Sequence, residues 1–123
     1  MARFQGDLPD RSFAFARIIL SIVRALPKDA CGGAIGRQLA RSGTSIGANV
    51  HEADVALTDP EFTHSCSIAR KEASETLYWL RLCKADGLLT GPKLDAAITE
   101  ADELLHILSA IVKKTEKRRT RSR

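Results

Sequence analysis

Apolar residues recur every three to four positions along almost the whole chain, and this helical period is interrupted at only three short places. No window shows the alternation of polar and apolar residues that marks a half-buried strand. The interruptions fall at Pro27, at the TDPE sequence that starts with Thr58, and at the pair Asp86 and Gly87. Helices joined by such short connections pack as antiparallel neighbours, so the pattern predicts an all-α fold, an up-down-up-down antiparallel four-helix bundle.

Capping residues place the expected helix boundaries. Asp10 is the expected N-cap of the first helix, which stops before Pro27 because the proline ring disfavours helical geometry in the preceding residue. The Thr58 hydroxyl can accept the amide proton of Glu61, whose carboxylate can reach back to the cap, and Pro60 suits the first turn of the same helix. Pro92 starts the last helix. The expected helices cover residues 11–26, 33–55, 58–85 and 92–115, where the last one frays.

The charge of the chain is divided unevenly. Residues 113–123 hold seven Lys or Arg and one Glu, a net charge of +6, whereas residues 1–112 hold 12 basic and 14 acidic residues, a net charge of −2. The 123 residues therefore divide into one four-helix domain over 1–112 and a flexible basic tail over 113–123. A cationic tail on a mildly acidic body favours a polyanionic partner such as nucleic acid, and a solvated tail that only aids solubility is the alternative.

Apolar side chains are more numerous than a single bundle can cover. They surround most of the helix over 11–26 and form two stripes on the helix over 58–85. Exposed apolar patches of more than a few hundred Å² normally mark interfaces, so we expect a homo-oligomer, with a large-cored monomer as the alternative. The expected interface residues are Phe15, Ile18, Ile19, Ile22, Ile68, Trp79 and Leu82.

The helix over 33–55 contains Gly36, Gly43 and Gly47, each of which costs ~1 kcal/mol relative to alanine in a helix interior. Together with Ala40 they line one side, which predicts close approach of another helix backbone. A glycine-rich phosphate cradle would need GxxxxGK[ST] after a strand, and the sequence has neither. The polar residues expected to hydrogen-bond across this contact are Ser42, Ser45 and Asn49.

Two runs of sequence carry a resemblance to a known family. They are RQLARSGTSIGANVHEA from Arg37 to Ala53 and IARKEASETLYWLRL from Ile68 to Leu82, with RSFAFA opening at Arg11. Over about residues 11–112 the chain closely resembles the four-helix bundle family of rRNA intervening-sequence proteins, which includes the accessory variability determinant of diversity-generating retroelements. The resemblance implies a cytosolic homopentameric barrel without enzymatic activity. For the retroelement branch it implies association with a reverse transcriptase and with RNA or DNA through basic surfaces.

Basic residues of the helices extend the candidate nucleic-acid surface beyond the tail. Arg70 and Arg81 project in similar directions and are flanked by Ser67, Ser74 and Tyr78, which makes a polar stripe able to meet phosphates. A solvated helix face is the alternative interpretation. The candidate nucleic-acid-binding residues are Arg37, Arg70, Arg81, Lys113, Lys114, Lys117, Arg118, Arg119, Arg121 and Arg123.

Arg41 is a similar candidate for nucleic-acid binding, but a structural role is favoured. It is predicted to pair with Glu72 or Glu75 and so to orient two helices. The residues assigned a structural role are therefore Arg41, Ser45, Asn49, Glu72 and Glu75.

Two Glu-x-x-His pairs raise the possibility of a di-iron site, because this spacing puts both ligands on one helix face. They are Glu61 with His64 and Glu103 with His106. If the turn before Pro92 centres near residue 89, the pairs lie ~12 to 16 Å apart along the bundle at 1.5 Å per residue, too far to share a metal. We therefore expect no metal, no cofactor and no enzymatic activity.

The cysteines and the hydropathy give the remaining expectations. Cys31, Cys66 and Cys83 are odd in number and fit neither a disulfide framework nor a zinc pattern, so all three are expected to be reduced and structural. No apolar run approaches the ~18 residues that span a bilayer, so we expect a cytoplasmic protein without membrane association.

Overall fold

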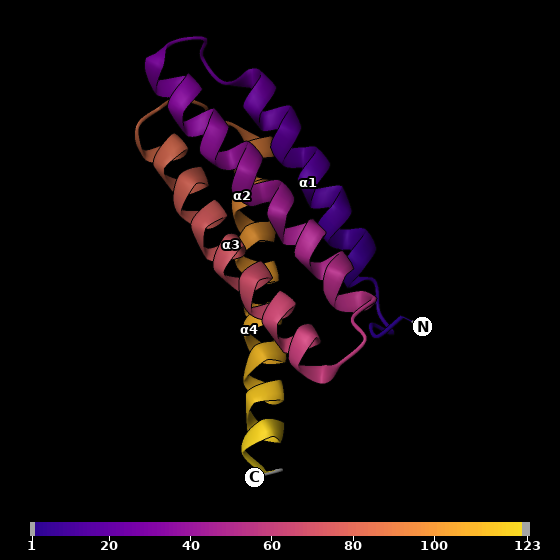
Figure 1. The fold of residues 1–123 in the computed structure, drawn as a ribbon. Helices are drawn as coiled ribbons and strands as arrows, with labels where there is room; N and C mark the ends of the chain where they lie inside the picture. Colours follow the sequence, from indigo (N-terminus) through magenta and orange to yellow (C-terminus); the bar gives the residue numbers. More distant parts are fainter. Residues whose placement is uncertain (1, 122–123) are drawn as a thin grey trace.

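The structure, a computed structural model, describes residues 2–121 except for the side chain of Arg119. This part of the chain forms α1 (Leu8–Ala25), α2 (Ala30–Asp54), α3 (Asp59–Ala85) and α4 (Pro92–Arg121), and no strand is found in it. The helices run alternately up and down (Figure 1), with α2 packed against α1 and α3, and α4 packed against α3 and more lightly against α1. The predicted all-α fold with four helices is confirmed. None of these helices combines the length and apolar character needed to cross a membrane.

The first two helices begin three residues earlier than expected. α1 begins at Leu8, so its N-cap is Asp7 and not Asp10, and the Asp7 side chain makes no capping hydrogen bond. α2 begins at Ala30 because the Asp29 carboxylate accepts a hydrogen bond from the Gly32 amide at 2.8 Å. Capping by an acidic side chain explains the early start of α2, and the sequence pattern placed it too late because the residues that follow are glycines.

The start of α3 is confirmed. The Thr58 hydroxyl accepts a hydrogen bond from the Glu61 amide at 3.3 Å, as the TDPE sequence predicts. The Glu61 carboxylate also reaches back, but it accepts from the Leu57 amide at 3.1 Å, one residue before the cap. Glu61 is therefore committed to holding the start of this helix.

The expected end of α4 near Thr115 is wrong, because the helix continues to Arg121. In Figure 1 its yellow C-terminal part extends past the ends of the other three helices. Thr115 is buried, and its hydroxyl donates to the Val112 carbonyl at 2.9 Å. Lysine and arginine are good helix formers and are favourable near the C-terminal end of the helix dipole, so a basic run can continue a helix. Arg123 and the side chain of Arg119 lie outside the described residues.

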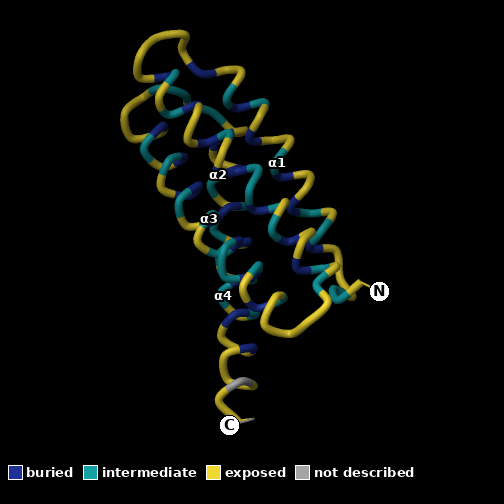
Figure 2. The backbone as a smooth tube through the Cα atoms, in the orientation of Figure 1, coloured by how far each residue is buried: buried dark blue, intermediate teal, exposed yellow. Residues whose placement is uncertain are grey.

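The core lies along the axis between the four helices, where the buried positions in Figure 2 face one another. Three residues assigned above to an interface between copies, Phe15, Ile19 and Ile22, are at most 1% exposed and belong to this core. That assignment is wrong because α1 is apolar around most of its circumference, and periodicity alone does not show which arc meets α2 and α4. Of the other interface candidates, Ile18 is 37% exposed, and the half-buried ones are Ile68, Trp79 and Leu82.

The predicted close approach of a backbone to the glycines of α2 is confirmed, and the neighbour is α1. A Cβ added at Gly43 would lie 2.6 Å from Ile19 Cγ2, and one added at Gly47 would lie 3.1 Å from the Ser12 carbonyl oxygen. A Cβ at Gly36 would be in ordinary contact, 3.4 Å from Val23. The missing side chains let α1 and α2 pack closely, which offsets the low helix propensity of glycine.

Within the described residues, none of the three polar residues beside the glycines hydrogen-bonds across the glycine contact with α1, and only Ser42 bonds to another helix. The hydroxyls of Ser42 on α2 and Thr76 on α3 are buried and hydrogen-bonded at 2.9 Å. Ser45 instead donates to the Arg41 carbonyl, and Asn49 donates to the Ser45 carbonyl, both within α2. The expected cross-helix role of Ser45 and Asn49 is therefore wrong, because short polar side chains find backbone partners in their own helix.

The cysteines differ in accessibility, which leads to a labelling prediction. Burial raises the pKa of the Cys66 thiol to about 11 and holds that of Cys83 above its usual value, whereas Cys31 is exposed. Since the thiolate is the reactive form, we expect only Cys31 to react with a thiol reagent at pH 8, and all three cysteines to react in denaturant. Counting labelled thiols by mass spectrometry checks this, and rapid labelling of Cys66 in the folded protein would contradict the described packing.

Candidate nucleic-acid interface

Many carboxylates of the bundle are bound to cations of the same chain. The expected pairing of Arg41 is present: its guanidinium bonds Glu72 at 3.0 Å and also contacts Glu75. Arg11 bonds Glu100 through two nitrogens at 2.6 Å each, and this hydrogen bonding raises the pKa of the Arg11 guanidinium. Further ion pairs join Arg3 to Asp59, Arg11 to Glu103 and Lys84 to Asp95. Much of the negative charge of the body is therefore compensated locally.

Several of the candidate nucleic-acid-binding cations have no such partner. Within residues 2–121, Arg70 and Arg81 of α3 form no hydrogen bond or ion pair, although Arg70 is half-buried. The same is true of exposed Lys71, which lies beside Arg70 and was not among the sequence candidates. Within the same described part of the chain, no hydrogen bond or ion pair is formed by the side chains of Arg37, Lys113, Lys114, Lys117 and Arg121.

The predicted polar stripe of α3 forms one wall of an open groove between α3 and α4, here called the α3–α4 groove. Ser67, Arg70, Ser74 and Tyr78 line it, so the structure brings these residues together as expected. The other lining residues are Lys71 and Glu75 of α3 and Leu105 and Ser109 of α4. Arg81 follows Tyr78 by three positions and therefore continues the same side of α3.

The α3–α4 groove leads onto residues 113–121 of α4, here called the basic extension. Thr115 of this segment is still buried, and the end of the helix extends past the other three (Figure 1). Lys113 follows the groove residue Ser109 by four positions, one helical turn. A second open depression on the basic extension is lined by Lys113, Glu116, Lys117, Thr120 and Arg121. Cations thus continue from the groove along the exposed face of a helix, where the charge pattern predicts a flexible tail.

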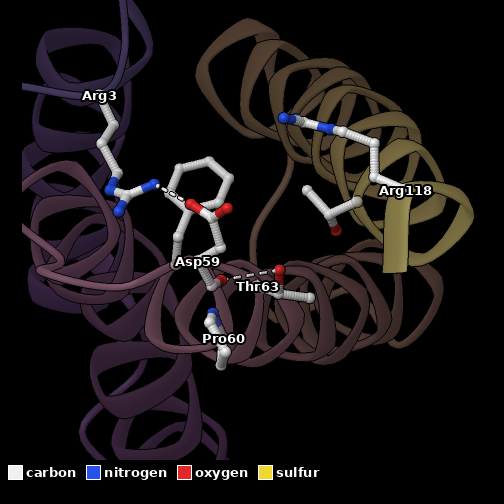
Figure 3. A pocket seen from close by; sticks show the side chains of 7 residues that line it. Arg3, Asp59, Pro60, Thr63 and Arg118 are labelled. Carbon is white, nitrogen blue, oxygen red and sulfur yellow. Dashed lines mark hydrogen bonds and ion pairs between the residues drawn. The ribbon is translucent and has the colours of Figure 1, made fainter. Parts of the chain in front are cut away.

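Arg118 and Arg37 lie elsewhere. Figure 3 shows Arg118 across a pocket from Asp59, whose carboxylate is bound by Arg3 at 2.9 Å. Hydrogen bonding from Arg3 and, to a smaller extent, the charge of Arg118 lower the pKa of Asp59. Arg37 lines a depression between α1 and α2 that also contains Val23. The structure therefore does not place these two arginines in the α3–α4 groove.

Members of both Glu-x-x-His pairs make other contacts. The Glu61 carboxylate accepts from the Leu57 amide at 3.1 Å, and His106 Nδ1 lies 2.8 Å from the Asp102 carbonyl oxygen and 3.7 Å from its carboxylate. Among the described residues, no group of three or more His, Cys, Asp or Glu side chains is placed to hold a metal ion.

Known proteins resemble the chain over most of its length. The family model described as 23S rRNA-intervening sequence protein matches residues 7–110, which include both runs that carry the resemblance noted above. A crystal structure of a Bacteroides thetaiotaomicron protein of unknown function, from the S23 ribosomal protein family, is 34% identical with a TM-score of 0.79. That match covers 86% of this chain and 98% of the other. No curated protein matches the chain.

Proposed function

Because the chain belongs to the 23S rRNA-intervening sequence protein family, we propose that it is a non-enzymatic, homo-oligomeric protein that binds nucleic acid. The observation that carries the proposal is the separation of charges on the fold. Carboxylates such as Glu72, Glu75 and Glu100 are bound within the bundle, whereas Arg70, Arg81 and the lysines of the basic extension have no partner in the described residues.

Such an arrangement suits phosphate binding. Each phosphate that a lysine or arginine neutralises releases condensed counterions, and a cation already bound to a carboxylate gains less from this exchange. The basic extension presents Lys113, Lys117 and Arg121 at intervals of four residues on an exposed helix, so one strand can meet several of them. A row of exposed cations is sufficient for binding that makes no base-specific contacts.

Assembly would multiply the interface. Exposed apolar residues remain on the outer faces of α1, where Phe13 is 67% exposed, Ile18 37% and Leu20 36%. We propose that copies cover such residues in a pentamer, which would present five groove and extension surfaces and add avidity. The same apolar surface favours the second candidate function, a structural or protein-interaction ring that binds no nucleic acid.

Replacing three cations of the basic extension tests the proposal. The variant Lys113→Gln/Lys117→Gln/Arg121→Gln keeps good helix formers and should bind a structured RNA at least tenfold more weakly at ~0.1 M salt, because about three phosphate contacts are lost. Affinity is measured by fluorescence anisotropy of a labelled RNA.

The matched control is Lys28→Gln/Lys84→Gln/Lys93→Gln, which removes the same charge from exposed positions away from the extension and from the apolar face of α1. It should bind within about twofold of the wild-type chain, since its residues are outside the proposed contact. Equal losses in both variants would show that only net charge matters. No RNA binding by the wild-type chain would leave the interaction ring as the function.

A further inference from the structure

Tyr78 is a large aromatic side chain on a surface otherwise lined by cations and hydroxyls. It is 59% exposed and lines the α3–α4 groove with Arg70. Its ring meets that of Trp79 edge-on, with centroids 4.9 Å apart and planes at 76°. Trp79 Nε1 in turn donates to the Glu75 carboxylate at 3.0 Å, and Glu75 is bound by Arg41 of α2. A chain of contacts therefore braces the tyrosine ring while leaving much of it accessible.

The serines of the groove also have unused hydrogen-bonding capacity. The hydroxyls of Ser67, Ser74 and Ser109 form no hydrogen bond within the described residues. By contrast, Thr44 and Ser45 of α2 donate to carbonyls of their own helix. Hydroxyls without a protein partner can donate to phosphate oxygens or contact base edges.

We infer that the α3–α4 groove binds single-stranded nucleic acid, with one base stacked on Tyr78 and phosphates of the same strand, on either side of that base, held by Arg70 and Arg81. The inference rests on the proposed nucleic-acid binding and adds the class of strand to it. Arg81 lies three positions after Tyr78 and Arg70 eight positions before it, which places the cations ~4.5 Å and ~12 Å along the helix axis on either side of the ring.

This spacing suits an unpaired strand. The interval of ~16 Å between the two arginines corresponds to about five nucleotides at 3.4 Å per stacked nucleotide. A base can stack on an aromatic ring only when its own face is free, and in a duplex the base faces are covered by neighbouring pairs. A groove that offers a ring between two cations therefore favours single strands, whereas a basic helix alone would accept either form.

The chain's one tryptophan, Trp79, can report binding by its fluorescence, because its ring contacts that of the groove residue Tyr78. A 12-nucleotide unstructured RNA should quench the fluorescence of Trp79 and bind at least tenfold more tightly than the same sequence in a duplex. Tyr78→Leu keeps an apolar side chain but removes the stacking surface, and it should weaken single-strand binding by about 5- to 150-fold.

Tyr78→Phe is the matched control, because it keeps the ring and should bind within about twofold of the wild-type chain. Equal unfolding midpoints show that both variants fold, as expected for an exposed position. Wild-type affinity in Tyr78→Leu, or equal affinity for duplex and single strand, would overturn the inference. If the basic-extension variant still lost affinity in that case, the proposed function would stand. Absence of any RNA binding would overturn both.

Discussion

Gly43→Val is expected to destabilise the bundle by about 3 kcal/mol, because the new side chain would occupy the space already filled by Ile19. The Cβ alone would lie 2.6 Å from Ile19 Cγ2, and Ile19 is fully buried, so the neighbour has no room to move aside. The overlap with Ile19 can be removed only if α1 moves away from α2 along the whole glycine contact. For a domain of this size the thermal midpoint should fall by about 12 °C, which calorimetry or circular dichroism measures.

Two further variants separate crowding from other effects of valine in a helix. At Gly33, which is also on α2, a Cβ would meet only the end of the Arg37 side chain at 3.5 Å, so Gly33→Val should change stability by less than about 1 kcal/mol. The double variant Gly43→Val/Ile19→Ala nearly conserves volume across the contact. It should be less destabilised than the sum of the two single variants, and strict additivity would show that Gly43 and Ile19 do not compete for space.

Thr76→Val is expected to destabilise the protein by about 2 kcal/mol, although the two side chains have almost the same shape. The substitution removes the partner of the buried Ser42 hydroxyl, which forms no other hydrogen bond within the described residues. A buried polar group left without a partner costs about 1–3 kcal/mol. Denaturant unfolding measures the change in the free energy of unfolding, provided that both proteins show the same dependence of this free energy on denaturant concentration.

The double variant Ser42→Ala/Thr76→Val removes both hydroxyls of this hydrogen bond and leaves neither without a partner. Its stability should lie closer to that of the wild-type chain than to that of Thr76→Val alone, because the cost comes from stranding one hydroxyl. A double variant less stable than the single one would mean that the space around Ser42, and not its hydrogen bond, decides stability.

The features predicted correctly from the sequence are those set by neighbouring residues or by one helix face. The Thr58 cap depends on four consecutive residues, and the glycine side of α2 follows from helical spacing. The assignment of Phe15 failed because α1 is apolar on nearly all sides, so the choice between core and surface depends on where α2 and α4 lie. The positions of α2 and α4 around α1 depend on the packing of all the helices and not on the residues of α1 alone.

The candidate site shows the same division. The stripe of Ser67, Arg70, Ser74 and Tyr78 lies on one helix and was therefore visible in the sequence. Its opposite wall, including Ser109, depends on the register between α3 and α4, which spacing within one helix does not determine. The charge of the basic extension predicts a flexible tail, whereas the helix propensity of lysine and arginine indicates the helix that is found.

The salt dependence of RNA binding tests the proposed charge arrangement most directly. Affinity of the wild-type chain for an unstructured RNA is measured between 50 and 200 mM salt, and the logarithm of the association constant is plotted against the logarithm of the salt concentration. Five cations, Arg70, Arg81, Lys113, Lys117 and Arg121, should give a slope of about −3.5 or steeper at ~0.7 per phosphate contact. A slope near zero, or no detectable binding at 50 mM salt, would contradict the proposed role of these cations.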